Sequence, residues 1–543
     1  MDLEAVWCHW CHLMDAKTYH NPNVAKLINE NFIPIRVDQD AHPDISNRYE
    51  DYGWPATVIF DADGKEIVKR RGYIGPKFMG WFLEAVIAEP TPEAHDNKQR
   101  VVVSGNTTLL SKEQKELLNS RYEFIYDKNH KGWGRDQKFI HSDSIEYAMT
   151  QAAMGSKEHE KMAKDTLDAA RVLIDPIWGG VYQYSDEADW QSPHFEKIIL
   201  IQTDSLRLYA LAYNQWGRQK DLDSALQIYG YLTDMLRSPE GAFYTSQDAD
   251  LNSEVDGHAY FPLNNKELRK LGIPRIDKNI YARENGWVIS ALTTLYSATG
   301  DKQYLNNGIT AANWIIDNRS VKNGGFQHEK NKESSLFLAD TLAMGQAFLD
   351  LYATTGNKDW LNRSMKASSF IAKYFKDPKG GFSTRATAEK NLLLTSVKHI
   401  NSQILTARLG NLLHHYSGKK EHRDLAEHAM KYLTSPDLTN QRRLLAGVLL
   451  TNLEMSQDPI HITIVGDKSS DAAKALFEAG TRYPAEYMRV EWWDKSEGDL
   501  PNPDVSYPKL ANPAAFACAN KACSSPIYET KKIAKVVNAL MGL

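Results

Sequence analysis

The chain has 543 residues, of which 42% are hydrophobic and 24% are charged, and its net charge at pH 7 is −5. A chain of this length exceeds what one hydrophobic core ordinarily serves, so several domains are expected. The slightly acidic balance gives no reason to expect a nucleic acid partner, and no apolar run is long enough to predict a membrane span.

The four cysteines form two close pairs that lie far apart in the chain. Cys8 and Cys11 are separated by His-Trp, and Cys518 and Cys523 lie near the C-terminus. An apolar segment precedes the first pair and a helical pattern follows it, which places one thiol at a helix N-terminus. There the peptide dipole lowers the pKa of the thiol. The second thiol can then close a disulfide, as in a dithiol redox centre.

Zinc binding is the alternative interpretation of these two pairs, with His9 or His12 nearby. The first pair lies between a strand and a helix and lacks the glycine-rich turn that is typical of structural zinc sites. We therefore expect no metal and no cofactor other than a redox-active Cys8–Cys11 disulfide.

Residues 1–90 predict an α/β domain. Apolar and β-branched runs predict strands at 2–7, 32–38, 54–60 and 65–70, and helical patterns lie at 11–31, 43–52 and 76–88. This order, with C-x-x-C after the first strand and Trp54-Pro55 before a β-rich run, resembles the thioredoxin fold.

The thioredoxin resemblance implies a role for each residue that matches it. Cys8 would be the exposed nucleophile and Cys11 the resolving thiol, while Pro55 would be the cis-proline beside them. Asp2 would be the buried carboxylate that helps to move the proton of the resolving thiol. A protonated His9 would stabilise the thiolate of Cys8. The alternative is a dithiol with only a structural role.

The start of the chain bears on its location. Thioredoxins usually have a further strand and helix before the strand that leads into C-x-x-C. We therefore expect either a minimal domain or a missing upstream segment, which could hold a signal peptide. The location is unknown from the sequence: cytoplasmic by default, and periplasmic or otherwise extracytoplasmic if a signal segment is missing.

Residues 91–139 are expected to connect this domain to a helical one at 140–456. Helix pairs are predicted at 142–155 with 158–174, 196–215 with 219–236, 280–298 with 302–317, 336–355 with 358–375, and 396–416 with 420–433. A last helix at 440–456 would form a sixth pair with another part of the chain. Glycine-aromatic turns recur after the second helix of a pair. Six such hairpins predict an (α/α)6 toroid, whose inner helices line a funnel and whose loops form its rim.

The predicted rim is rich in carboxylates and aromatic side chains, which suits sugar chemistry because rings stack on sugars and paired carboxyl groups supply acid and base. The candidate substrate-binding residues are Trp190, His194, Glu196, Asp248, Asp250, Asp204 and Asp340. For Asp204 and Asp340 the alternative is a role as helix N-caps.

Residues 457–543 predict a small α/β extension with a cysteine-containing tail. Strands are predicted at 460–466 and 487–493, and helices at 470–479 and 531–543. We expect this element to pack on the toroid as a structural cap.

Several strings of residues occur in an order that resembles a known family. They are Trp-Cys-His-Trp-Cys-His at 7–12, Gly-Arg-Asp-Gln-Lys-Phe at 134–139, Pro-His-Phe-Glu-Lys at 193–197 and Asp-Ala-Asp at 248–250. Together they resemble the spermatogenesis-associated protein 20 family, in which a thioredoxin-like domain is fused to a toroid similar to N-acylglucosamine 2-epimerase. The resemblance implies a redox domain beside a carbohydrate-active one. No motif matches the catalytic histidines of the epimerases, so epimerase activity is not carried over.

The sequence favours a thiol–disulfide oxidoreductase whose toroid binds a client or a carbohydrate. Its partners would be a protein disulfide or dithiol, or a reductant, and no nucleic acid is expected. One alternative is a carbohydrate-active enzyme, epimerase- or glycosidase-like, with its active site at the toroid mouth. The other is a binding scaffold without catalysis.

Overall fold

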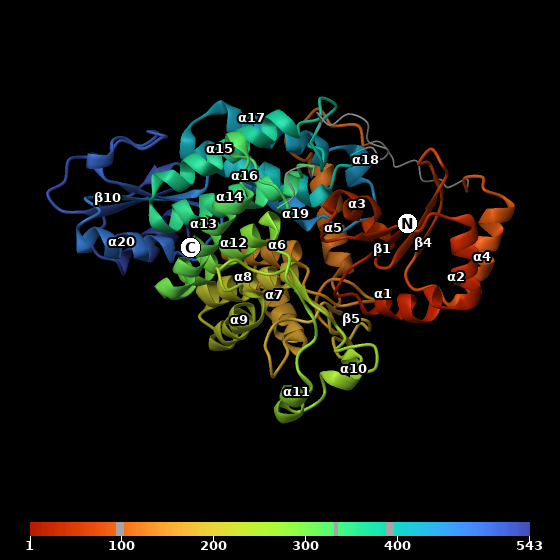
Figure 1. Ribbon diagram of the computed structural model, residues 1–543. Helices are drawn as coiled ribbons and strands as arrows, with labels where there is room; N and C mark the ends of the chain where they lie inside the picture. Colours follow the sequence, from red (N-terminus) through yellow and green to blue (C-terminus); the bar gives the residue numbers. More distant parts are fainter. Residues whose placement is uncertain (94–101, 331–334, 387–395) are drawn as a thin grey trace.

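The computed structural model describes residues 1–93, 102–330, 335–386 and 396–543. Figure 1 shows a central body of helices with an α/β domain on either side, the N-terminal one in red and the C-terminal one in blue. No helix among the described residues is both long and apolar enough to cross a membrane.

The N-terminal domain is built on a four-stranded sheet in the order β2-β1-β3-β4, with β1 parallel to β2 and the other neighbours antiparallel. The strands are β1 (Asp2–Glu4), β2 (Arg36–Asp38), β3 (Ala56–Phe60) and β4 (Glu66–Arg71). The helices are α1 (His9–Met14), α2 (Pro22–Asn31), α3 (Pro43–Tyr49) and α4 (Pro76–Ala88). The strand order and the helix after β1 agree with the thioredoxin-like fold predicted for residues 1–90.

The single helix predicted at 11–31 is divided in two. A π-helical turn follows α1 at 15–19, and α2 begins afresh at Pro22. Proline lacks the N–H that a helix interior needs, and it fits the first turn of a new helix. The Asn21 side chain caps that turn by accepting hydrogen bonds from the backbone N–H groups of Asn23 and Val24.

The central body is a closed ring of six inner helices, each packed on the next. They are α6 (Ser142–Ala153), α8 (Ile199–Trp216), α12 (Ala282–Thr299), α14 (Leu338–Thr355), α16 (Ile400–Ser417) and α19 (Ala446–Ser456). An outer helix packs against each: α7 (Lys157–Ala170), α9 (Gln219–Tyr231), α13 (Lys302–Arg319), α15 (Lys358–Tyr374), α17 (Lys420–Leu433) and α5 (Lys112–Ile125). This is the predicted (α/α)6 toroid.

The sixth hairpin joins distant parts of the chain. Its inner helix, α19, packs against α5, which lies within the segment 91–139 that the sequence analysis assigned as a connector. The connector therefore supplies one wall of the toroid.

Short elements form the rim of the toroid and the loops beside it. They are β5 (Tyr184–Ser185), β6 (Pro193–His194), β7 (Lys197–Ile198), β8 (Ser246–Gln247), β9 (Ile276–Asp277), α10 (Gly257–Tyr260), α11 (Asn265–Leu271) and α18 (Pro436–Thr439). β7, β8 and β9 form a small antiparallel sheet at the entrance to α8.

One hydrogen bond recurs where a glycine-aromatic turn leads into an inner helix. A polar side chain in the first turns of the helix accepts the N–H of a residue one or two positions after the last glycine of the turn. The pairs are Gln202 with Val181 (2.6 Å), Asn285 with Phe243 (2.8 Å), Thr341 with Phe326 (3.1 Å) and Gln403 with Phe382 (2.7 Å). Since all these groups are buried, each pair satisfies a backbone donor that water cannot reach.

The interpretation of Asp204 and Asp340 as N-caps is wrong. Helix α8 begins at Ile199 and α14 at Leu338, so both aspartates lie inside their helices. The residues at the N-cap positions are Ile198 and Phe337, whose side chains make no capping hydrogen bond.

The C-terminal domain covers the C-terminal ends of the inner helices, as expected for a cap. Its sheet has the order β11-β10-β12-β13. The elements are β10 (Ile460–Val465), α20 (Asp471–Thr481), β11 (Met488–Trp493), β12 (Ala514–Ala519), β13 (Ala522–Cys523) and α21 (Lys532–Met541). A disulfide joins Cys518 to Cys523 across β12 and β13. At the junction with the toroid, the Val490 N–H donates to the Tyr416 hydroxyl (2.9 Å).

The recurring hydrogen bond predicts the effect of one substitution. Asn285 is fully buried, and its amide group bonds both the N–H and the C=O of Phe243. Replacing Asn285 with Ala leaves both groups unpaired, which we expect to lower the free energy of unfolding by about 2–4 kcal/mol. Urea unfolding followed by circular dichroism measures the change. Asn306→Ala, on the exposed face of α13, is the matched control, and equal effects of the two substitutions would contradict this account.

Candidate dithiol site at the toroid mouth

The dithiol has the local geometry predicted from the sequence. Cys8 occupies the N-cap position of α1, and its sulfur accepts a hydrogen bond from the backbone N–H of Cys11 (3.1 Å). A disulfide joins the two residues. In the reduced state, a thiolate of Cys8 would lie at the positive end of the helix, where it is stabilised.

The residues that surround the dithiol in the thioredoxin comparison are also in place. The Trp54–Pro55 bond is cis, as the resemblance implied. Trp54 packs against the apolar cluster that contains Trp7, Cys8 and Cys11. The cysteines therefore lie against the loop that precedes β3.

Asp2 is a buried carboxylate at the start of β1. Burial raises its pKa to about 6, and its Oδ1 makes no hydrogen bond with the described residues. A carboxylate that titrates near neutrality can accept and return a proton, which is the role implied for it.

Cys8 is not the exposed nucleophile that the resemblance implied. Its side chain is 2% exposed and that of Cys11 is 4% exposed. Part of the cover comes from the toroid: Ile198 packs against the cysteine cluster, and the Ala249 N–H donates to the carbonyl of Trp7 (3.3 Å). The rim of the toroid thus lies directly on the dithiol.

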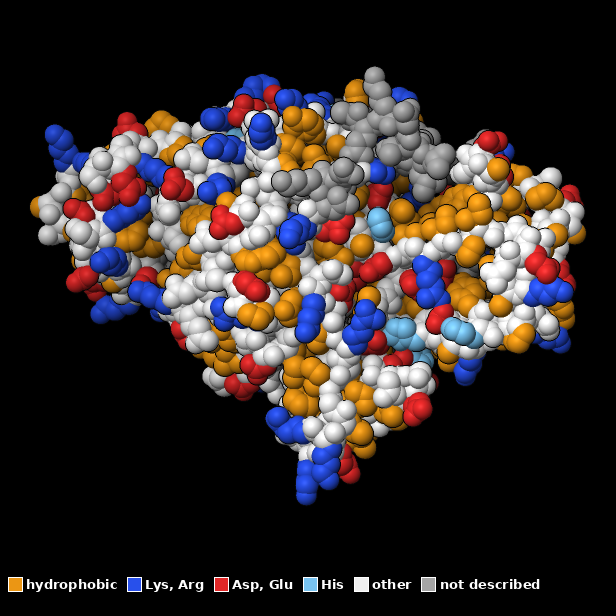
Figure 2. All heavy atoms as spheres, viewed as in Figure 1, with side chains coloured by type: hydrophobic (Ala, Val, Ile, Leu, Met, Phe, Trp, Pro, Cys, Tyr) orange, Lys and Arg blue, Asp and Glu red, His pale blue; other side chains and the backbone are white. Residues whose placement is uncertain are grey.

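Two histidines of α1 contact the Asp-Ala-Asp turn of the rim. His9 Nδ1 lies 2.9 Å from both carboxylate oxygens of Asp250, and this contact raises the pKa of His9. His12 Nδ1 lies 3.4 Å from Asp250 and 3.5 Å from Asp248. Burial raises the pKa of Asp248 to about 7. Figure 2 shows histidine and acidic side chains side by side where the N-terminal domain meets the toroid near α1.

Further contacts extend this interface across the mouth of the toroid. They are a hydrogen bond from His328 Nε2 to the carbonyl of Asp40 (2.7 Å) and ion pairs of His399 with Glu50 (2.9 Å), Arg443 with Asp51 (2.9 Å) and Arg385 with Asp44 (3.1 Å). The toroid partners come from the loops before α14, α16 and α19. The N-terminal domain therefore covers the mouth of the toroid and does not contact only one side of it.

Four of the seven candidate rim residues converge on α1. Besides Asp248 and Asp250, Glu196 Oε1 accepts the backbone N–H of His9 (3.4 Å), and the ring of His194 lies 6.4 Å from that of Trp10. His194 also stacks on Tyr184 and contacts Asp186 (2.6 Å).

The other three candidates lie elsewhere. Trp190 is 2% exposed, and its Nε1 donates to the carbonyl of His130 (2.8 Å), so it anchors the rim loop instead of facing a substrate. Asp340 is fully buried and pairs with His328 (2.8 Å). Asp204 lies in the wall of the funnel, where burial raises its pKa and Arg207 opposes the rise.

Two features were not predicted from the sequence. His12 was considered only as a neighbour of the cysteines, although its place one helical turn from His9, on the same face of α1, could have been predicted from spacing. The second feature is an ion network inside the funnel, formed by Glu146, Arg207, Arg408, Glu454 and Glu486. These residues come from four different inner helices or the C-terminal domain, and no spacing in the sequence brings them together.

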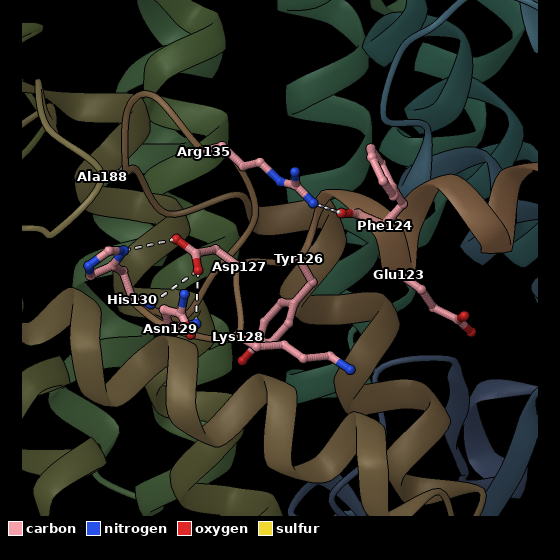
Figure 3. Close-up of a pocket in the computed structure, with 9 residues that line it drawn as sticks. All are labelled: Glu123, Phe124, Tyr126, Asp127, Lys128, Asn129, His130, Arg135 and Ala188. Carbon is pink, nitrogen blue, oxygen red and sulfur yellow. Dashed lines mark hydrogen bonds and ion pairs between the residues drawn. The ribbon is translucent and has the colours of Figure 1, made fainter.

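A pocket of about 550 Å³ lies on another part of the surface (Figure 3). Its lining residues are Glu123, Phe124, Tyr126, Asp127, Lys128, Asn129, His130, Arg135 and Ala188. The Asp127 carboxylate accepts the N–H groups of Asn129 and His130 and the ammonium of Lys138 (3.0 Å). Those bonds order the turn to which Trp190 is tied, which gives the pocket a structural role.

Two family comparisons match parts of the chain. A family described as "Protein of unknown function, DUF255" (Thioredox_DsbH) matches residues 1–105, and Glycosyl Hydrolase Family 88 matches residues 288–403. The first match contains the whole N-terminal domain, and the second contains α13, α14 and α15.

Similar proteins extend over almost the whole chain. An uncharacterized protein of Caenorhabditis elegans is 24% identical, covering 98% of this chain and 91% of its own, and spermatogenesis-associated protein 20 of Homo sapiens is 21% identical, covering 98% and 86%. The resemblance to the spermatogenesis-associated protein 20 family is thereby confirmed. Solved structures of a D-mannose isomerase (11% identity, TM-score 0.48, 59% of this chain and 84% of that one) and of a Bacillus thermoamylovorans cellobiose 2-epimerase (13%, 0.46, 59% and 86%) are also similar.

The raised pKa of Asp2 predicts a pH-dependent effect of Asp2→Asn. Above pH 6 the wild-type protein keeps a buried charge that the unfolded chain would hydrate, so the substitution should stabilise the fold. The free energy of unfolding should rise by about 3 kcal/mol at pH 8, and this increase should disappear as the pH falls from about 6 to about 4. Thermal unfolding at several pH values measures it, with exposed Asp63→Asn as the control. A stabilisation that does not vary with pH would contradict the assignment.

Proposed function

We propose that the protein is a thiol–disulfide oxidoreductase whose reactive cysteines, Cys8 and Cys11, work beneath the rim of the toroid. The position of Cys8 at the N-cap of α1 carries this proposal, because a helix terminus is where a cysteine becomes an ionised nucleophile. The cis bond before Pro55 and the buried carboxylate of Asp2 support the same chemistry.

In the reductive direction, the thiolate of Cys8 attacks one sulfur of a substrate disulfide. A mixed disulfide forms, and the other substrate sulfur leaves as a thiolate that takes a proton from solvent. Cys11 gives its proton to Asp2 and attacks the sulfur of Cys8, which releases the second substrate thiol and leaves the Cys8–Cys11 disulfide. A dithiol reductant then restores the two cysteines, and the opposite direction uses the same steps in reverse.

The cover over Cys8 restricts what can react with it. The disulfide of a large folded protein cannot reach a side chain that is 2% exposed. A small disulfide or a flexible peptide segment can reach it after only a small separation of α1 from the rim. Trp10 is 37% exposed and lies 6.1 Å from the ring of Tyr73, so an aromatic surface adjoins the covered cysteines. We propose that substrates reach Cys8 along this surface.

The proposal predicts the behaviour of the two cysteine variants. Cys8→Ser should abolish reduction of a small disulfide such as oxidised glutathione by the full-length protein. Cys11→Ser should accumulate a mixed disulfide on Cys8, detected by mass spectrometry of the intact protein. Cys518→Ser is the matched control and should keep full turnover. Retained turnover in Cys8→Ser would refute the proposal.

A carbohydrate-active toroid is the second candidate. The match of residues 288–403 to Glycosyl Hydrolase Family 88 favours it, together with the stacked rings of Tyr184 and His194 at the rim. The N-terminal domain covers this rim, so a sugar would bind at its edge beside Trp10, where aromatic rings can stack on apolar sugar faces.

This second candidate predicts that a panel of oligosaccharides contains at least one ligand, detected by calorimetry with the full-length protein. Tyr184→Ala should weaken its binding by about tenfold or more, since a stacking ring would be lost. Phe78→Ala, an exposed ring on α4, is the control. No binding across the panel would remove the carbohydrate function, and unchanged binding in Tyr184→Ala would exclude this edge as its site.

A further inference from the structure

We propose that His12, Asp248 and Asp250 bind a divalent transition-metal ion, best fitted by Zn²⁺, at the contact between α1 and the rim of the toroid. The site is distinct from the cysteine pairs that the sequence analysis considered for zinc. Its ligands come from two domains and are about 240 residues apart in the chain, so no local sequence motif predicts the site.

The spacing of the three ligand atoms fits a tetrahedral ion. His12 Nδ1 lies 3.5 Å from Asp248 Oδ1 and 3.4 Å from Asp250 Oδ2, and the three groups form one compact cluster. Ligands bound at about 2.1 Å in a tetrahedron are separated by about 3.4 Å. An ion can therefore enter between these atoms with only small movements of the side chains.

The buried carboxylates around this cluster favour the binding of a cation. Asp248, Asp250 and Glu196 are each at least nine-tenths buried, and within the described ranges every ion pair that they make is with a histidine. Glu196 Oε2 makes no hydrogen bond with the described residues, although it lies beside His9 and His194. Three carboxylates are thus buried close together with no lysine or arginine paired to any of them among the described residues, and a bound cation would lower the cost of that burial.

A second cluster in the same protein provides a contrast. Glu284, His328 and Asp340 also lie within ligand distance of one another, but Arg283 donates to Glu284 and supplies the positive charge. The cluster at α1 has no such arginine among the described residues, and a bound ion would take the place there that Arg283 has in the second cluster.

The two aspartates are held in place by backbone donors. The Asp250 N–H donates to Asp248 Oδ1 (3.0 Å), and the Gly257 N–H donates to Asp250 Oδ1 (3.0 Å). Outer hydrogen bonds of this kind orient metal ligands before the ion arrives. A Cβ on Gly257 would come within 2.7 Å of the carbonyl of Ala249, so only glycine lets this N–H approach.

His9 is a further nitrogen donor beside the proposed site. Its Nδ1 contacts both oxygens of Asp250 and can serve as an outer donor that orients this carboxylate. Nitrogen from imidazole and oxygen from carboxylate suit Zn²⁺, Co²⁺ and related ions, whereas Mg²⁺ and Ca²⁺ prefer oxygen alone. With both cysteine pairs oxidised, no thiolate competes for the ion.

The test uses the full-length protein in its fully oxidised state, after removal of metals with a chelator. Calorimetry with Zn²⁺ should give one site per chain, and Co²⁺ should give visible absorption without the sulfur-to-metal band that cysteine ligands produce. Because the ion joins two domains, Zn²⁺ should also raise the melting temperature. Absence of Zn²⁺ binding by the oxidised protein would overturn the proposal.

Variants locate the ion. His12→Gln and Asp248→Asn should each weaken Zn²⁺ binding by about 100-fold or more and remove the thermal shift. His20→Gln is the matched control, since His20 faces a single carboxylate, that of Asp15. Equal binding in all three variants would place the ion elsewhere and would refute this site. The wild-type Co²⁺ spectrum decides between nitrogen–oxygen and sulfur ligands even if one variant fails to fold.

Discussion

The contact between α1 and the Asp248–Asp250 turn is the interaction on which the arrangement of this protein depends. Through it, Cys8 at the N-terminus of α1 is buried against the rim of the toroid instead of facing solvent. Two domains thereby contribute residues to one interface. In the function that we propose, the reaction of the cysteines and binding at the rim take place next to each other at this interface.

The opposite end of the toroid is closed as well. Glu486 of the C-terminal domain reaches Arg207, and Arg408 lies 2.9 Å from Glu454 of α19. Burying such charges is costly unless each is paired, so this network requires the inner helices and the C-terminal domain to remain together. These ion pairs lie next to the C-terminal domain, whereas the reactive groups that we propose lie at the mouth, under the N-terminal domain.

The parts of the structure that were predicted from the sequence depend on signals only a few residues long. The N-cap position of Cys8 and the limits of α4 each follow from neighbouring residues, and the cis bond at Pro55 was implied by the match of a short motif to the thioredoxin fold. The break at Pro22 had such a signal too, in Asn-Pro, but the apolar period across 11–31 masked it. The burial of Cys8, the pairing of α5 with α19 and the histidine–aspartate cluster could not be predicted. Each depends on surfaces that meet only after the domains have folded.

The central claim is that the rim of the toroid covers the dithiol in the folded protein. The most direct measurement is the alkylation rate of Cys8 in the reduced protein, in a Cys518→Ser, Cys523→Ser background, with iodoacetamide and with a polyethylene glycol maleimide. The account predicts slow reaction with the small reagent, exclusion of the large one, and fast reaction with both in urea. Equal, fast modification by both reagents without urea would contradict it.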